Sequence, residues 1–89
     1  MSSYREIAQR IPAEYRKEIL ETNIITKAQA SAMDVSMVYL FIIWRNHVEP
    51  NNDLSLECGL CITRILDNFK QLLDTLVELE KESRLLNSL

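Results

Sequence analysis

Glycine and proline are scarce in this sequence, which has one glycine and two prolines in 89 residues. Sheet proteins need many tight turns, and these two residue types usually supply them, so the shortage argues against an all-β fold. The apolar share of 47% is enough for a real core and too high for intrinsic disorder. We therefore expect an all-α fold, organised as a single helical domain over residues 1–89.

Long apolar runs are also missing. The longest run, Met37–Trp44, has eight residues, whereas a helix that crosses a bilayer needs about 20. The N-terminal residues show no apolar signal-peptide region. Two cysteines without a secretion signal indicate free thiols in a reducing compartment, so we expect a cytoplasmic protein without a membrane partner.

Basic side chains are outnumbered, with 10 Lys and Arg against 13 Asp and Glu and a net charge of −3. Residues 1–52 carry six charges of each sign, and residues 53–89 carry seven acidic and four basic side chains. Proteins that bind nucleic acid usually have the opposite bias, because neutralised phosphates supply most of their affinity. DNA or RNA is therefore not an expected partner.

Catalytic motifs are absent as well. The sequence has one histidine, no Gly-x-Ser-x-Gly, no phosphate-binding loop and no His-Glu-x-x-His. Carboxylate pairs such as Glu14 and Glu18 lie at helical spacing, but no Glu-x-x-His motif accompanies them to form a di-metal site. We do not expect an enzyme.

Capping signals indicate where the N-terminal helices begin. Ser3 and Glu6 have the spacing of a capping box, which predicts a helix over residues 4–10. Pro12 suits a first helical position, so a further helical segment is expected from Ala13 to Thr22. These segments over residues 4–22 form either one kinked helix or two.

A second capping box, Thr26-x-x-Gln29, predicts a helix over residues 27–46. Its second half contains Met37–Trp44, which is apolar almost all round and must be covered on several sides. The same run is rich in residues that favour strands, so a strand is the alternative prediction for it.

Pro50 lies in the clearest loop, residues 48–53, and a third helix is expected over residues 54–86. A loop of about six residues between two long helices predicts an antiparallel helical hairpin. In that hairpin Trp44 lies near Cys58, and Met33 lies near Phe69.

The last helix of this hairpin is longer than its partner, and its apolar stripe has heptad-like spacing. We expect the N-terminal helices to cover part of the overhang and a second copy of the chain to cover the rest, which predicts a homo-oligomer. The alternative is a monomer whose N-terminal segment covers the overhang completely. The predicted interface residues are Leu72, Leu76, Leu79 and Leu86.

The motif Cys58-Gly59-Leu60-Cys61 has three interpretations. The favoured one is packing, in which the thiols continue the buried stripe and Gly59 allows a neighbouring helix to approach closely. The second is a zinc site formed by Cys58, Cys61 and His47 with a fourth ligand. The third is thiol redox chemistry, for which a Cys-x-x-Cys at the start of a helix is suited.

Four basic residues could bind an anion if an oligomer gathered them around a cleft. The candidates for this small anionic ligand are Arg16, Lys17, Lys27 and Arg64. Glutamates interleave with them, which is also typical of a solvated helix face. Trp44 is expected to be a core or interface anchor.

The segment Leu40-Phe41-Ile42-Ile43-Trp44-Arg45-Asn46-His47-Val48-Glu49-Pro50-Asn51, followed by Cys58–Lys70, resembles a set of small uncharacterised proteins of bacteriophages and mobile elements. The resemblance covers residues 38–70 and implies an origin, with the host cytoplasm as location, but no activity. Some phage proteins of similar architecture form rings that sequester nucleotide signals, although no motif of theirs occurs here.

The sequence therefore supports three hypotheses. The first is a non-enzymatic, self-associating helical protein that binds another protein, such as a host factor. The second is an oligomer that sequesters a small nucleotide-like anion. The third is a helical domain stabilised by zinc.

Overall fold

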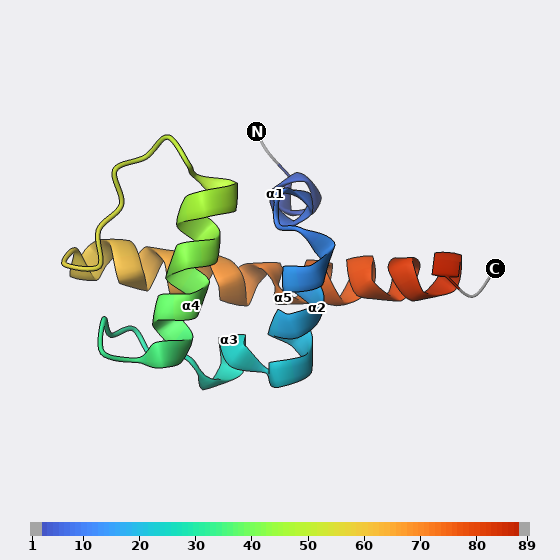
Figure 1. The fold of residues 1–89 in the computed structure, drawn as a ribbon, viewed down its shortest axis with the longest axis horizontal. Helices are drawn as coiled ribbons and strands as arrows, with labels where there is room; N and C mark the ends of the chain where they lie inside the picture. The colour runs from blue at the N-terminus through green and yellow to red at the C-terminus, as the bar shows by residue number, and fades with distance from the viewer. Residues whose placement is uncertain (1–2, 88–89) are drawn as a thin grey trace.

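A computed structural model describes residues 3–87, and all regular structure among them is helical. The all-α prediction is therefore confirmed. The helices are α1 (Tyr4–Arg10), α2 (Ala13–Thr22), α3 (Ile24–Lys27), α4 (Val35–Ile43), the π-helix η1 (Trp44–Val48) and α5 (Gly59–Asn87). Figure 1 shows α5 running through the whole molecule, with the other helices packed against it.

Helix α5 has 29 residues, so it is about 43 Å long at the usual rise per residue. Its apolar residues recur every three or four positions and therefore share one face. Each large side chain buried there contributes about 1.5–3 kcal/mol to folding. The buried residues of α5 are Ile62, Ile65, Leu66, Phe69, Leu72, Leu76 and Leu79.

The N-terminal segment forms two helices. The Ser3 hydroxyl accepts a hydrogen bond from the Glu6 N–H at 3.1 Å, so the predicted cap at the start of α1 is present. Ile11 has extended backbone, and α2 begins directly after Pro12. Asn23 then ends α2 with a left-handed conformation, at φ 53°.

The predicted helix over residues 27–46 is wrong in its first half. Helix α3 ends at Lys27, and the next helix begins only at Val35. The reason is Asp34, whose Oδ2 accepts hydrogen bonds from the N–H groups of Met37 and Gln29, at 3.1 and 2.9 Å. Aspartate is a strong N-cap, and here it closes the preceding loop as well.

The run Met37–Trp44 is helical, so the alternative strand prediction is wrong. The run is covered on most sides, and Phe41 and Trp44 are buried. Ile42 remains 41% exposed, so the cover is incomplete.

The third helix begins at Gly59 and not at residue 54. Residues 49–58 form a longer loop, in which the Ser55 carbonyl accepts a hydrogen bond from the Cys58 N–H at 3.1 Å. The long loop lets the chain change direction before α5 begins. The hairpin of two long helices predicted here is not observed, because α4 crosses α5 instead of running alongside it (Figure 1).

This crossing changes the neighbours that the hairpin predicted. The Trp44 ring packs edge-on against Phe69, with 5.4 Å between ring centroids, so its partner is not Cys58. Met33 is 91% exposed and does not pack beside Phe69.

The N-terminal helices of the same chain cover α5 only as far as Leu79. Leu72, Leu76 and Leu79 are buried, at 6% exposure or less. Two polar contacts fix α1 over this stretch of α5: the Tyr4 hydroxyl donates to Gln71 at 2.8 Å, and Arg5 pairs with Glu82 at 2.7 Å. The predicted interface leucines are therefore core residues, apart from Leu86.

Candidate functional site

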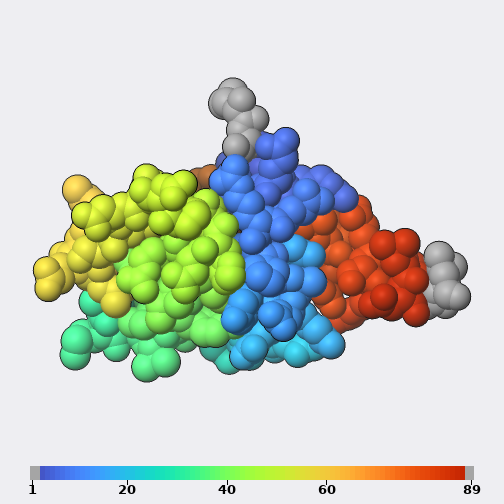
Figure 2. All heavy atoms as spheres, turned by 45° about the horizontal axis from the view of Figure 1, so that its top comes forward, coloured from blue at the N-terminus to red at the C-terminus, as the bar shows by residue number. Residues whose placement is uncertain are grey.

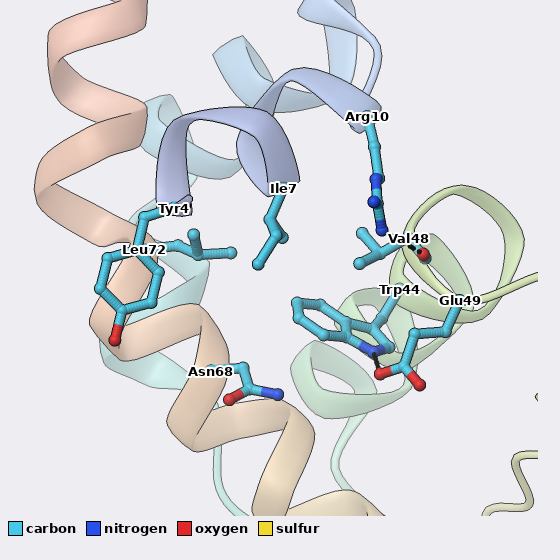
Figure 3. A pocket seen from close by; sticks show the side chains of 8 residues that line it. All are labelled: Tyr4, Ile7, Arg10, Trp44, Val48, Glu49, Asn68 and Leu72. Atoms are coloured by element: carbon cyan, nitrogen blue, oxygen red, sulfur yellow. Dashed lines mark hydrogen bonds between the residues drawn. The ribbon is translucent and has the colours of Figure 1, made fainter. Parts of the chain in front are cut away.

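A pocket of about 260 Å³ opens where α1, η1 and α5 meet (Figure 3). Its lining is largely apolar, with Ile7, Val48 and Leu72 around the Trp44 ring and polar groups of α1, α5 and the following loop beside them. The residues that line it are Tyr4, Ile7, Arg10, Trp44, Val48, Glu49, Asn68 and Leu72. A volume slightly below the usual range for ligand sites suits one side chain or a small ring.

The π-helix η1 forms one wall of this pocket, through Trp44 and Val48. The Glu49 N–H donates to the Trp44 carbonyl at 2.9 Å, a hydrogen bond that spans five residues where an α-helix spans four. This wider turn brings the Glu49 carboxylate back to the Trp44 side chain, whose indole N–H donates to Oε1 at 2.6 Å. Short π-helices are frequent at functional sites, and this one joins two lining residues of the pocket.

Glu49 is the polar centre of this region. Besides Trp44, its carboxylate accepts hydrogen bonds from Arg64, at 2.8 Å, and from the Asn52 amide. Burial alone would raise the pKa of Glu49, but the hydrogen bonds from Arg64, Trp44 and Asn52 and the charge of Arg64 lower it below its ordinary value. Glu49 is therefore a structural acceptor here and is poorly suited to be a general base.

Arg10 lies on the other side of the π-helix. Its Nη1 donates to the Val48 carbonyl at 3.2 Å. Val48 is the last residue of η1, and carbonyl groups at a helix end have no partner within the helix. With Glu49 paired to Arg64 as well, the charged groups of the pocket are already used by the fold. The pocket is suited to binding an apolar group and offers no nucleophile–base pair.

Within the single chain, the four predicted anion-binding residues are not gathered around one cleft, and the arrangement expected in an oligomer stays a prediction. Arg16 donates to the Ile11 carbonyl at 2.6 Å and thereby caps the end of α1. Arg64 is paired with Glu49. Lys17 lines a groove between α2 and α5, whereas Lys27 lines a separate hollow beside Tyr39.

The three predicted zinc ligands are not brought together either. Cys58 and Cys61 are joined to each other in a disulfide bond, and the His47 ring packs against Tyr15 with 5.5 Å between centroids. Among residues 3–87 there is no group of three His, Cys, Asp or Glu side chains placed to hold a metal ion.

The disulfide also corrects the expectation of free thiols and of thiols packed in the core. Both cysteines are partly exposed and lie outside the buried cluster. A side chain added at Gly59 would meet nothing within 4 Å, so Gly59 does not allow a helix to approach. Of the three interpretations of the motif, redox chemistry fits its position best, because the pair spans the first turn of α5.

Sequence reasoning missed two features of this region, the π-helix and the role of Glu49. Nothing in the sequence around Glu49 indicates that its carboxylate accepts hydrogen bonds from both Trp44 and Arg64. The prediction that Trp44 is a core anchor is confirmed, because it is 3% exposed.

Within the described residues, the helices are too short or too polar to cross a bilayer. The resemblance to small phage proteins stays a prediction, because no family model, curated protein or solved structure matches this chain.

Proposed function

We propose that this chain is a non-enzymatic interaction protein that binds other proteins, beginning with a second copy of itself, through the end of α5. The supporting observation is a pair of exposed leucines. Leu85 and Leu86 are 69% and 71% exposed, and they follow Leu79, the last buried residue of the helix. Figure 2 shows this end of α5 projecting beyond α1 and α2.

A groove next to the projecting end could bind these leucines of a second copy. It lies between α2 and α5, has a volume of about 410 Å³, and has Leu20, Leu73 and Val77 as its apolar lining. Lys81 also lines the groove, and Leu85 follows it by four residues, so Leu85 lies on the same side of α5.

Two copies related by a twofold axis could fill both grooves at once. Each copy would place its Leu85 and Leu86 against the groove of the other, which is the self-complementary arrangement of symmetric dimers. The groove also carries charges of both signs, with Lys17 and Lys81 beside Glu21 and Glu80, so a twofold axis can place opposite charges together. Burial of the leucines supplies the favourable free energy.

The native mass of the purified protein, measured by light scattering over a range of concentrations, tests this proposal. We expect a dimer for the wild-type chain and a monomer for the double variant Leu85→Glu, Leu86→Glu. Leu60→Glu is the matched control, because Leu60 is 86% exposed at the opposite end of α5. A wild-type chain that is monomeric at all concentrations would contradict the proposal, as would a dimer that the double variant retains.

A further inference from the structure

The Cys58–Cys61 disulfide lies at the start of the longest helix. The Cys58 carbonyl accepts the first α5 hydrogen bond, from the Ile62 N–H at 3.1 Å, so Cys58 occupies the N-cap position. Its Sγ accepts a hydrogen bond from the Cys61 N–H, also at 3.1 Å. The cysteine sulfur thus takes the place that a serine or aspartate oxygen takes in an ordinary N-cap.

This position favours a thiolate on Cys58. The first turn of a helix presents unpaired N–H groups and the positive end of the helix dipole, which stabilise negative charge. The same effects make a cysteine at a helix N-terminus, or in a Cys-x-x-Cys motif, more acidic than a free one. When the disulfide opens, the Cys61 N–H that already bonds the sulfur would hold the Cys58 thiolate.

The surroundings of the pair leave it accessible. Leu60, between the two cysteines, is 86% exposed, and a Cβ placed at Gly59 would meet no atom of another segment within 4 Å. The bridge also closes a very short loop, and short loops give a disulfide the least stabilising effect. The Cys58–Cys61 bridge is thus partly exposed, lies outside the core and adds little stability. These properties are typical of reactive disulfides rather than structural ones.

We infer that Cys58 and Cys61 form a redox-active pair that exchanges its disulfide with a dithiol of another protein, with Cys58 as the sulfur that forms the mixed disulfide. This chemistry goes beyond the proposed binding function and does not depend on it.

The exchange proceeds in two steps. A thiolate of the partner dithiol attacks Sγ of Cys58, the Cys58–Cys61 bond breaks, and Cys61 leaves as a thiolate that takes up a proton. The second thiolate of the partner then attacks the partner sulfur that is bonded to Cys58, and the partner's disulfide forms. Cys58 leaves as a thiolate that the helix N-terminus stabilises. Two electrons pass from the partner dithiol, which becomes a disulfide, to the pair, which becomes two thiols.

The first measurement uses the full-length wild-type protein and glutathione as the probe. The protein is equilibrated in buffers of different glutathione to glutathione disulfide ratios, and its free thiols are alkylated and counted by mass. We expect a reversible change between no free thiols and two within this series. A pair that remains oxidised in excess glutathione, or one that glutathione disulfide fails to oxidise, would overturn the inference.

The second measurement tests the role of Cys58 with the variants Cys61→Ser and Cys58→Ser. Each keeps one thiol and is allowed to react with glutathione disulfide at pH 7. We expect Cys61→Ser, which keeps Cys58, to form the mixed disulfide at least about threefold faster than Cys58→Ser. A more acidic thiol is a weaker nucleophile, but its larger thiolate fraction at pH 7 outweighs this loss. The difference should vanish in denaturant, where α5 is lost. Equal rates in the folded variants would overturn the role of Cys58.

Circular dichroism shows whether each variant keeps its helices. If either variant is unfolded, the wild-type equilibrium with glutathione still decides whether the pair is redox-active.

Discussion

The indole N–H of Trp44 donates to Glu49 Oε1 at 2.6 Å, across the single wide turn of η1. The same oxygen accepts a hydrogen bond from Arg64 at 2.8 Å, so one carboxylate connects the π-helix to α5. Trp44 is buried and Glu49 is largely so, which means that water cannot easily replace the carboxylate as the partner of the indole. This contact therefore couples the shape of the pocket to the stability of the fold.

Replacement of Glu49 by alanine is expected to destabilise the protein by about 1–3 kcal/mol, because it leaves the buried Trp44 N–H without its acceptor. Urea denaturation followed by tryptophan fluorescence measures this change, and Trp44 is the single tryptophan of the chain. The matched control is Glu57→Ala, which removes an exposed carboxylate of the loop before α5 and should change stability by less than about 0.5 kcal/mol. Equal effects of the two substitutions would contradict the role given to Glu49.

Stability should fall as the solution becomes acidic. The pKa of Glu49 is lowered in the folded protein although burial opposes the shift, because of its hydrogen bonds from Arg64, Trp44 and Asn52. A carboxylate with a lowered folded pKa contributes stability that is present above its unfolded pKa and lost as the pH falls through the folded pKa. The loss should therefore begin near pH 4.5, the ordinary value for glutamate, and continue below it.

Glu82 contributes to the same trend, because the hydrogen bond from Arg5 lowers its pKa. This pair is solvent-exposed, so its effect should weaken in high salt. Melting temperatures of the wild-type protein and of Glu49→Gln, measured between pH 7 and pH 3, separate the two contributions. The variant should start from a lower stability and lose less of it on acidification, and parallel curves would refute the assignment to Glu49.

The Tyr39 hydroxyl is buried and, among the residues that the structure describes, has no hydrogen-bond partner. Its pKa is raised by burial and by the nearby Glu18 and Tyr15. Tyr39→Phe removes this unsatisfied group and should leave stability unchanged or raise it by up to about 1 kcal/mol. Tyr4→Phe, which deletes the hydroxyl that donates to Gln71, is the control and should cost about 0.5–1.5 kcal/mol. Thermal melts of both variants decide the matter, and a clear loss in Tyr39→Phe would mean that the hydroxyl has a partner.

Two leucines of α5 should respond very differently to truncation. Leu76→Ala removes a fully buried side chain and is expected to cost about 2–5 kcal/mol. Leu85→Ala, at an exposed position, should cost less than about 0.5 kcal/mol when measured at dilutions where the chain is monomeric. Chemical denaturation of the two variants tests whether Leu76 belongs to the core, as the structure shows, or to an interface, as the sequence pattern suggested.

Local signals in the sequence predicted the N-terminal helices and the apolar face of α5 well. Ser3 caps α1, and α2 follows Pro12, because these preferences are decided within a few residues. The stripe from Ile62 to Leu79 follows from helical spacing alone. Such features need no knowledge of the tertiary structure.

The errors arose where two local signals competed or where packing decided. The Thr26 capping box predicted a helix from residue 27, but the helix begins after Asp34, whose carboxylate accepts hydrogen bonds from two backbone N–H groups. The angle between α4 and α5 depends on the long loop and on the space that α1 and α2 occupy, which no short motif encodes. The hairpin prediction failed for this reason, and with it the prediction that Leu72, Leu76 and Leu79 form an interface.

The candidate site was less predictable than the fold. Cys58 and Cys61 were recognised as a motif, but composition favoured free thiols, and the structure joins them. The pocket beside Trp44 is lined by η1, and a π-turn has no sequence signature comparable to a capping box.

Helix α5 follows every other helix in the chain, and α1 to α4 all bury apolar residues against it. During synthesis the first helices therefore leave the ribosome without the surface that they pack on, and α1 must wait for the segment around Leu76 and Leu79. Ile19, Ile25 and Phe41, which are buried in the folded protein, would stay uncovered until that segment has emerged. Folding of this protein is thus expected to be a late event of translation, and nascent chains that stop before Leu79 should be recognised as unfolded.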